Sequence, residues 1–472
     1  MHNASQNEVS ALHDLSAVDM MAGFRARQFS PSEVLDDVLA HVALWEPHIK
    51  ALYAFDPEGA RVVAKQSTGR WQKGEPAGAL DGVPVTIKDN IATKGVPVAM
   101  GTATTKLVPS EVDSPPAARL REAGAVIFSK TTMPDYGMLS SGLSSFHPLT
   151  RNPWDLRQNP GGSSAGAGAA CAAGYGPLHL GTDIGGSVRL PACWCGIVAL
   201  KPSLGRVPVD PPYVGRVVGP MTRTVDDAAL MMSVMAKPDR RDGMSLPPDN
   251  INWKALDKSP RKIRIGLLLD PGVGQALEED VRDVVVKAAK AFEGAGAVVT
   301  EVNGILTRQM LDGLDNFWRA RLWDELSQLS PAERAKALPY IVRWAETAAK
   351  LSGVDVVRGF NATMAIRAAA GRLFADLDYV ISPVAPVVKF AAEPAAPLND
   401  PDKPFEHICY TLPWNMAENP AISINGGYDA AGFPIGVQII GRRFDDIGVL
   451  GMAKTFEGLR GEQRPWPGVP KQ

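Results

Sequence analysis

Two segments decide the fold: Asn159-Pro160-Gly161-Gly162-Ser163-Ser164-Ala165-Gly166 and Gly181-Thr182-Asp183-Ile184-Gly185-Gly186-Ser187-Val188-Arg189-Leu190-Pro191. Glycine and serine are frequent in both, and Ser163 and Ser187 lie 24 residues apart. Small side chains let the backbone approach a neighbouring group closely. We therefore expect these segments to line a site, although glycine and serine runs alone also occur as flexible loops or helix caps.

The second segment has residues that suit acyl transfer. Amide hydrolysis requires a nucleophile, a base, an acid for the leaving nitrogen and hydrogen-bond donors for the developing oxyanion. The glycines immediately before Ser187 allow successive N–H groups to point at one position, as in an anion-binding nest. We predict Ser187 as the nucleophile, with an oxyanion hole made by the backbone N–H groups of Ile184, Gly185, Gly186 and Ser187.

A third segment, Gly82-Val83-Pro84-Val85-Thr86-Ile87-Lys88, supplies a candidate base. Its β-branched residues, followed by Asp89-Asn90, are typical of a buried strand. A lysine at the end of such a strand is largely desolvated, which disfavours its ammonium form and leaves an amine that can accept a proton. Taken alone, a strand-end lysine is more often a surface residue. The prediction of Lys88 as base therefore depends on its combination with the two serines.

Together, the three segments resemble the amidase signature family in residues, order and serine spacing. The resemblance implies cleavage of an amide-type carbon–nitrogen bond of a small-molecule amide through an acyl-enzyme at Ser187. It also implies that Ser163 relays protons between Lys88 and Ser187, and that the Gly162–Ser163 peptide bond is cis. Supporting roles are expected for Ser164, Thr182, Asp183 and Arg189, the last two as an ion pair that shapes the site. Matching segments flank the three, at Arg151–Asp155, Lys201–Ser203, Gly219–Val225, Asn419–Ser423 and Gly436–Gly441.

One alternative motif overlaps the first segment. Gly162-Ser163-Ser164-Ala165-Gly166 satisfies G-x-S-x-G, the nucleophile elbow of α/β-hydrolases, which would make Ser164 the nucleophile. That motif requires a hydrophobic strand directly before it, whereas residues 152–160 are mainly polar and contain two prolines. Its histidine would have to be His179 or His407, and neither has a supporting pattern. The context therefore favours Ser187.

The composition is that of a globular protein rather than a disordered one, with 45% hydrophobic and 21% charged residues among 472. The formal net charge of −2, without long runs of one sign, argues against nucleic-acid and membrane surfaces. The four cysteines form no CxxC pair and are predicted to be buried thiols. Gly272-Val273-Gly274 lacks the third glycine of a dinucleotide site. We expect no metal and no cofactor.

The sequence also predicts a cytoplasmic protein. The first twenty-one residues lack the basic start and continuous apolar core of a signal peptide. No stretch reaches the roughly 18 apolar residues that a membrane-spanning helix needs.

We predict an α/β fold with a large mixed, mostly parallel sheet, covered by helices on both faces. The order strand, helix, strand over residues 82–128, and strand followed by helix from Ile263, indicates parallel neighbours. Residues 1–472 are expected to form a single domain with a helical elaboration. Its parts are N-terminal helices at about 10–50, a signature core at about 78–230, a helical insertion at about 305–375, and closing strands and a helix at about 376–460.

Two departures from the family pattern leave the substrate open. Pro134-Asp135 stands where the family commonly has glutamate, and residues 141–147 replace a polar glycine stretch that often lines the acyl side. His147 in that stretch is a candidate substrate contact, with solvent exposure as the alternative. A pocket wall or the core would equally suit the three tryptophans of the helical insertion, Trp318, Trp323 and Trp344.

The leading hypothesis is a free-standing amidase acting on a small amide. The alternatives are an A-type amidotransferase subunit that needs partner subunits, a hydrolase of a related ester, carbamate, urea-like or hydrazide substrate, and a non-enzymatic member of the fold. The last is disfavoured because Lys88, Ser163 and Ser187 are all present. A homodimer is left open as the assembly.

Overall fold

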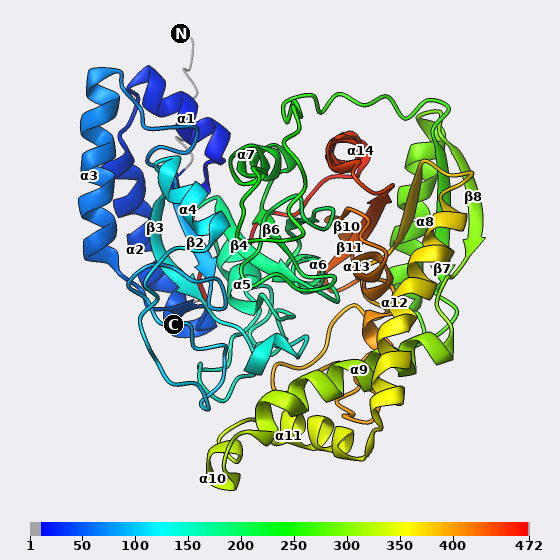
Figure 1. The fold of residues 1–472 in the computed structure, drawn as a ribbon. Helices are drawn as coiled ribbons and strands as arrows, with labels where there is room; N and C mark the ends of the chain where they lie inside the picture. Colours follow the sequence, from blue (N-terminus) through cyan, green and yellow to red (C-terminus); the bar gives the residue numbers. More distant parts are fainter. Residues whose placement is uncertain (1–10, 471–472) are drawn as a thin grey trace.

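The computed structural model describes residues 11–470 (Figure 1). Residue 10, where the predicted N-terminal helices begin, lies outside the described residues, as do the first ten residues of the segment without signal-peptide features. Within residues 11–470, no helix is both long enough and apolar enough to cross a membrane.

An eleven-stranded sheet runs through the molecule, with the N-terminal helices beside one end and β7 and β8 at the other (Figure 1). In spatial order its strands are β1 (Leu52–Tyr53), β3 (Val126–Thr131), β2 (Pro84–Lys88), β4 (Leu178–Asp183), β6 (Val217–Thr222), β5 (Val198–Lys201), β10 (Ala421–Tyr428), β11 (Pro434–Gly441), β9 (Tyr379–Pro383), β7 (Arg264–Asp270) and β8 (Val298–Asn303).

Helices connect and cover these strands. They are α1 (Ala17–Ala26), α2 (Pro31–Ile49), α3 (Pro57–Lys73), α4 (Pro115–Glu122), α5 (Ala165–Ala173), α6 (Arg189–Cys195), α7 (Val225–Met235), α8 (Glu279–Gly294), α9 (Arg308–Ser327), α10 (Pro331–Arg334), α11 (Pro339–Glu346), α12 (Gly353–Leu373), α13 (Leu412–Met416) and α14 (Asp446–Leu459). Short 3-10 helices add η1 (Leu12–Asp14), η2 (Asp135–Gly137), η3 (Thr347–Lys350) and η4 (Glu406–Ile408).

The mixed α/β sheet is confirmed, but the expectation that it would be mostly parallel is wrong. Parallel pairing joins β3 to β2, β2 to β4, β9 to β7 and β7 to β8. The six other neighbouring pairs are antiparallel. The prediction rested on the strand and helix order at the two flanks, which does not extend to the centre. There, strands such as β6 and β11 are buried on both faces, so their side chains show no alternation that would distinguish antiparallel from parallel pairing.

Helices cover both faces of the sheet, as predicted. On β11 the Gly436 N–H lies 3.3 Å from Cys193 Sγ of α6. The next residue, Val437, points to the opposite face, where a Cβ on the neighbouring Gly426 would meet both Val437 and Val284 of α8. Helices α6 and α8 therefore lie on opposite sides of the same strands.

Helices α9 to α12 occupy Arg308 to Leu373, between β8 and β9, and project beyond the sheet in Figure 1. Side-chain caps start three of them: Thr307 accepts the Met310 N–H ahead of α9, and Ser330 and Ser352 form capping boxes with Glu333 and Asp355 ahead of α10 and α12. One face of α9 lies against the loop that follows β4, because a Cβ on Gly185 of that loop would lie 3.4 Å from Trp318 of α9.

Candidate active site

The site lies where parallel strands end. Strands β3, β2 and β4 are parallel neighbours, so their carboxyl ends meet at one edge of the sheet. Lys88 is the last residue of β2 and Asp183 the last of β4. Two glycine- and serine-containing loops reach the same edge: one enters α5 and the other leads from β4 into α6. The predicted site residues, far apart in sequence, are thereby brought to one place.

The Lys88 amine is surrounded by hydroxyl groups. Its Nζ donates to Ser163 Oγ at 2.8 Å, to Thr182 Oγ1 at 2.9 Å and to Ser164 Oγ at 3.0 Å. Lys88 is completely buried, and within residues 11–470 it forms no ion pair with a carboxylate. The environment therefore offers hydrogen bonds to the amine without a counter-charge in contact with it.

Burial lowers the pKa of Lys88 to about 7, although the carboxylates of Asp183 and Asp89 pull it upward and Arg216 pushes it down. A lysine whose pKa is near neutrality exists in part as the free amine at physiological pH. Lys88 therefore has the property that a lysine base needs, a neutral amine that can accept a proton.

Ser163 and Ser164 occupy different positions around that amine. The Gly162–Ser163 peptide bond is cis, as the family resemblance implied. Ser164 is completely buried, and its Oγ donates to the Thr182 carbonyl at 3.2 Å. An enclosed hydroxyl of this kind does not suit the nucleophile elbow, so the alternative that made Ser164 the nucleophile finds no support in the geometry.

Close backbone approach explains the small residues of α5, all nine of which are buried. A Cβ on Gly166 would lie 2.2 Å from the Ala51 carbonyl oxygen, and one on Gly168 would lie 2.8 Å from Pro191 at the start of α6. The absence of side chains lets α5 pack against the sheet and α6, which sets the loop containing Ser163 beside Lys88.

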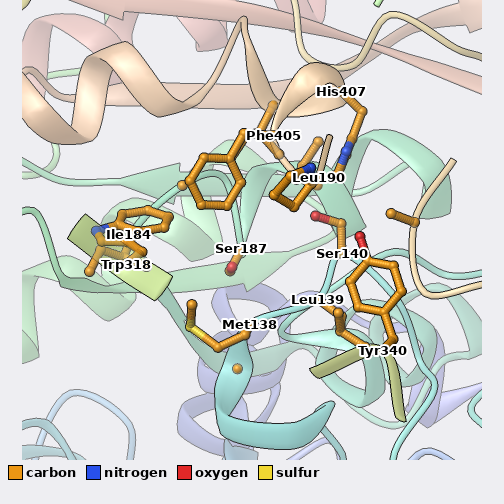
Figure 2. Close-up of a pocket in the computed structure, with 15 residues that line it drawn as sticks. Met138, Leu139, Ser140, Ile184, Ser187, Leu190, Trp318, Tyr340, Phe405 and His407 are labelled. Carbon is orange, nitrogen blue, oxygen red and sulfur yellow. The ribbon is translucent and has the colours of Figure 1, made fainter. Parts of the chain in front are cut away.

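Ser187 is partly exposed and lines a pocket (Figure 2). Its carbonyl accepts the Ser164 N–H at 3.1 Å, which ties the two serine loops together. Within the described residues, no hydrogen bond joins the Ser163 and Ser187 hydroxyls. The structure therefore brings Lys88 and Ser163 into direct contact and leaves the Ser187 hydroxyl at the pocket surface.

The loop around Ser187 offers fewer free donors than the sequence predicted. The Gly186 N–H donates to Asp183 Oδ1 at 2.9 Å, so Gly186 is corrected from an oxyanion donor to a loop-shaping residue. Glycine is required there because φ is +130° and a Cβ at this position would lie 2.5 Å from Thr411 Oγ1. In the described chain, the N–H groups of Ile184, Gly185 and Ser187 have no protein acceptor.

Asp183 and Arg189 hold this loop in place. The two are fully buried and pair in a bidentate manner, with Arg189 Nε and Nη2 each 3.0 Å from an Asp183 oxygen. Arg189 also donates to Gln438 Oε1 at 2.7 Å, and Asp183 accepts the Val188 N–H at 3.1 Å. Burial by itself would raise the pKa of Asp183, but the charge and hydrogen bonds of Arg189 hold it well below its ordinary value. The expected ion pair is present, and Asp183 also accepts two backbone N–H groups of the loop.

The pocket beside Ser187 is narrow, with an internal volume of about 40 Å³. None of its lining side chains belongs to Asp, Glu, Lys or Arg. Figure 2 shows Trp318 on one side of Ser187, with Ser140, Tyr340 and His407 on the other. The lining residues are Gly137, Met138, Leu139, Ser140, Ile184, Gly185, Ser187, Leu190, Trp318, Tyr340, Ala396, Pro404, Phe405, His407 and Ile408.

Several of these residues were not predicted as part of the site. The segment from Pro404 to Thr411 follows the helical insertion in the chain and folds back over the loop after β4. Its Thr411 Oγ1 donates to the Gly185 carbonyl at 2.6 Å, and its His407 lines the pocket. No local pattern marks this segment, because its role depends on a contact between residues more than 200 positions apart.

His147 is not a substrate contact in the structure. It is buried, with its Nε2 at 3.0 Å from Oδ2 of Asp89, the residue that follows Lys88 in the chain. Asp135, which stands where the family commonly has glutamate, accepts the Ser145 N–H at 2.8 Å and the Leu338 N–H at 3.1 Å. The stretch 141–147 is thereby tied to the start of α11 instead of facing the pocket.

The three tryptophans of the helical insertion have different surroundings. Trp318 lines the pocket, and buried Trp344 donates from Nε1 to Asp315 Oδ1 at 2.8 Å. The Arg334 guanidinium lies over the ring of Trp323, with its Cζ 4.7 Å from the ring centroid.

The prediction of buried thiols is confirmed for all four cysteines. Within the described residues, no cluster of three or more His, Cys, Asp or Glu side chains could hold a metal ion.

Comparison with known proteins identifies one family. The sequence model of the Amidase family matches residues 33–450. An acylamidase of Rhodococcus erythropolis is 34% identical over 469 residues, covering 96% of each chain. The A-type subunit of a glutamyl-tRNA(Gln) amidotransferase of Chloroflexus aurantiacus is 31% identical over 96% of this chain and 98% of that protein. A bacterial aryl acylamidase of the amidase signature family superposes with a TM-score of 0.89, at 29% identity and coverage of 95% of this chain and 97% of that one.

Proposed function

The chain belongs to the amidase family, and we propose that it works as a free-standing hydrolase of an amide-type carbon–nitrogen bond in a small, uncharged molecule. Ser187 is the nucleophile, Lys88 the base and Ser163 the proton relay. The single observation that carries this proposal is the buried Lys88 amine, 2.8 Å from Ser163 Oγ and surrounded by hydroxyls, in the loop cluster that also positions Ser187.

In the first half of the proposed reaction, Ser187 Oγ attacks the amide carbon. Its proton passes to Ser163 Oγ while the Ser163 proton passes to neutral Lys88 Nζ. The carbonyl oxygen becomes an oxyanion, which the free N–H groups of Ile184, Gly185 and Ser187 stabilise. The lysine ammonium then returns its proton through Ser163 to the leaving nitrogen, the C–N bond breaks, and an acyl-enzyme remains.

In the second half, water attacks the Ser187 ester and loses its proton along the same route. Collapse of the second tetrahedral intermediate breaks the bond between the acyl carbon and Ser187 Oγ, and the proton returns from Lys88 through Ser163 to that oxygen. The products are a carboxylic acid and an amine or ammonia, and no metal or cofactor takes part in any step of this proposal.

The uncharged pocket supports a free-standing amidase over a glutamine-using amidotransferase subunit. Free glutamine bears an ammonium and a carboxylate, and burying either without a partner is costly. No lining residue of the Ser187 pocket carries a charge that could pair with them. An uncharged aryl or alkyl amide suits the surfaces of Met138, Leu190 and Trp318 better.

The amidotransferase subunit is the second candidate function, favoured by relatives that match over nearly the whole chain, at 31% identity. A chain of that kind would act in a complex with partner subunits. Esters, carbamates, urea-like compounds and hydrazides share the carbonyl chemistry and are further candidate substrates. A homodimer and a cytoplasmic location stay predictions.

The test uses the purified chain alone. Wild type and Ser187→Ala are incubated with a fluorophosphonate probe, and any adduct is located by peptide mass spectrometry. Parallel samples receive benzamide, phenylacetamide, acetanilide and glutamine, and ammonia or amine release is measured. We expect an adduct on Ser187 and turnover of neutral amides but not of glutamine. Labelling on Ser164 would contradict the assignment, and labelling of Ser187 without any turnover would favour the subunit that needs partners.

A further inference from the structure

His407 differs from an ordinary buried histidine in having no protein partner. It is 3% exposed, belongs to η4 and lines the pocket that contains Ser187. Its Nε2 is buried without a hydrogen bond, and within residues 11–470 no protein group bonds to either ring nitrogen. Buried polar atoms almost always have a partner, and His407 lines a pocket, so its unpaired imidazole is a candidate to bond a molecule that fills the pocket. The Nε2 atom is sealed off, which leaves Nδ1 as the ring nitrogen that such a molecule can reach.

Another buried histidine shows the usual arrangement. In β4, His179 has Thr86 Oγ1 2.8 Å from its Nδ1 and the Gly176 carbonyl 3.1 Å from its Nε2. Burial lowers the pKa of both His179 and His407 to about 3, so both rings are neutral at physiological pH. A neutral imidazole has one donor and one acceptor nitrogen. In His179 both are used inside the protein, whereas in His407 neither is.

The position of His407 is fixed by its neighbours. The adjacent Glu406 accepts two hydrogen bonds from the Arg308 guanidinium, at 2.7 and 3.0 Å. On the other side, Ile408 packs against Gly185, and Thr411 bonds to the Gly185 carbonyl. These contacts fix the position of the His407 ring relative to the loop that would stabilise the oxyanion.

Ser140 is the other polar side chain at this part of the pocket. It lies on the same side of Ser187 as His407 in Figure 2, and no protein group within the described residues bonds to its hydroxyl. The nearby Tyr340 is already engaged, because its hydroxyl donates to the Asp400 carbonyl at 3.0 Å. The rest of the surface around these groups is apolar, with Leu139 and Phe405 among its members.

We propose that His407, assisted by Ser140, binds an uncharged hydrogen-bonding group of the substrate that is separate from the scissile amide. This inference rests on the proposed function and narrows its substrate class: a compact, mostly apolar amide with one additional neutral donor or acceptor, such as a ring nitrogen or hydroxyl. Amides that carry a carboxylate or ammonium at that position are excluded by the uncharged lining.

The test compares substrates that differ by one atom. Benzamide, nicotinamide and isonicotinamide have nearly the same size, and the last two replace a ring C–H with a hydrogen-bond acceptor. We expect wild type to prefer at least one pyridine amide over benzamide by about fivefold in kcat/KM, the worth of one net hydrogen bond. In His407→Phe the preference disappears, in His407→Gln part of it returns because the side-chain amide supplies a donor and an acceptor, and in Ser140→Ala it is reduced.

The control is His179→Gln, which alters a buried histidine that is already paired within the protein and should leave the substrate ratio as in wild type. Urea unfolding and fluorophosphonate labelling of Ser187 check that each variant folds and assembles its site. A pyridine preference that survives in His407→Phe, or no preference in wild type, would overturn the inference.

A second readout separates this inference from the proposed function. Ser187→Ala and the double variant Ser187→Ala/His407→Phe are titrated calorimetrically with the same three amides, which needs no turnover. Loss of the pyridine preference in the double variant supports the role of His407 even if wild type hydrolyses none of these amides. If the preference for the pyridine amides over benzamide is the same in both proteins, the role of His407 is contradicted even if hydrolysis is observed.

Discussion

Lys88 at the end of β2 and Lys201 at the end of β5 are alike in burial and different in their partners. Their strands point the same way, because β2 is parallel to β4 and both β4 and β5 are antiparallel to β6. Burial lowers the pKa of each lysine to about 7. Lys88 Nζ bonds to three hydroxyls, whereas Lys201 Nζ donates to the Pro202 carbonyl at 2.9 Å. Since a hydroxyl can relay a proton and a carbonyl cannot, a lowered pKa prepares a lysine for catalysis only where an exchangeable proton lies beside it.

The largest expected effect comes from replacing each of the two lysines by alanine. Lys88→Ala removes the base and should lower kcat/KM by about 10²- to 10⁴-fold, the usual worth of general base catalysis. Lys201→Ala removes an equally buried amine that bonds only to a carbonyl, and should keep most of kcat/KM even if stability changes. Steady-state kinetics on one neutral amide, with circular dichroism to check folding, measures both. Equal losses in the two variants would make burial, and not the hydroxyl partners, the decisive property.

The carboxylate that acts on both lysines gives the next effect. Asp183 lies near enough to raise the pKa of each, and it pairs with buried Arg189. Asp183→Asn leaves Arg189 buried without its counter-charge, and should lower the free energy of unfolding by about 3–5 kcal/mol. The control is Asp402→Asn, which opens an exposed pair with Arg343 and should cost less than about 1 kcal/mol. Urea unfolding measures both, and a similar cost in the two variants would contradict the structural role given to Asp183.

The third prediction compares a hydroxyl that contacts Lys88 with a hydroxyl near Lys201. Thr182→Val keeps the shape of the side chain but removes one acceptor from the amine, and should lower kcat/KM by about three- to tenfold. Ser203→Ala removes a buried hydroxyl just beyond Lys201, where Ser203 Oγ accepts the Phe444 N–H at 2.9 Å. That variant should leave kcat/KM close to wild type. A larger loss of kcat/KM in Ser203→Ala than in Thr182→Val would contradict the role given to the hydroxyls around Lys88.

The last effect concerns stability and pH. The pKa of Lys201 is about 7 in the folded protein and near its ordinary value of 10.5 in the unfolded chain, so between these values the unfolded chain binds more protons. Lys201 therefore opposes folding fully below pH 7, and this cost is relieved as pH rises, by at most about 1.4 kcal/mol per pH unit. Urea unfolding of wild type and Lys201→Met at pH 7.0 and 8.5 should show wild type gaining on the variant. A constant difference between the two proteins would mean that Lys201 stays protonated in the folded protein throughout this range.

Much of the site was predictable because its residues lie in three short segments with informative local chemistry. Lys88 at the end of an apolar strand, and Ser187 after two glycines, could be recognised once the three segments were taken together, because their order and serine spacing resemble those of the amidase signature family. His407 and Thr411 could not, since their approach to the Ser187 loop is a contact between distant parts of the chain. The commitment of the Gly186 N–H to Asp183 is likewise a matter of loop geometry that composition does not encode.

The fold shows the same division. Helices on both faces and parallel pairs at the two flanks follow from the order of strands and helices along the chain. The antiparallel centre does not, because strands such as β6 and β11 are buried on both faces and their side chains carry no alternation to reveal which neighbour they face. Local pattern predicts elements, and long-range packing decides how they pair.

The role of Lys88 as base is tested most directly by the rate at which a fluorophosphonate labels Ser187 as a function of pH, measured for wild type, Lys88→Ala and Lys201→Ala. If Lys88 activates Ser187, labelling of wild type rises with pH through about 7, as Lys88 loses its proton, and Lys201→Ala has the same profile. In Lys88→Ala labelling should be slow and lack this step. Rapid labelling of Lys88→Ala with an unchanged step near pH 7 would contradict the proposal that the buried Lys88 activates Ser187.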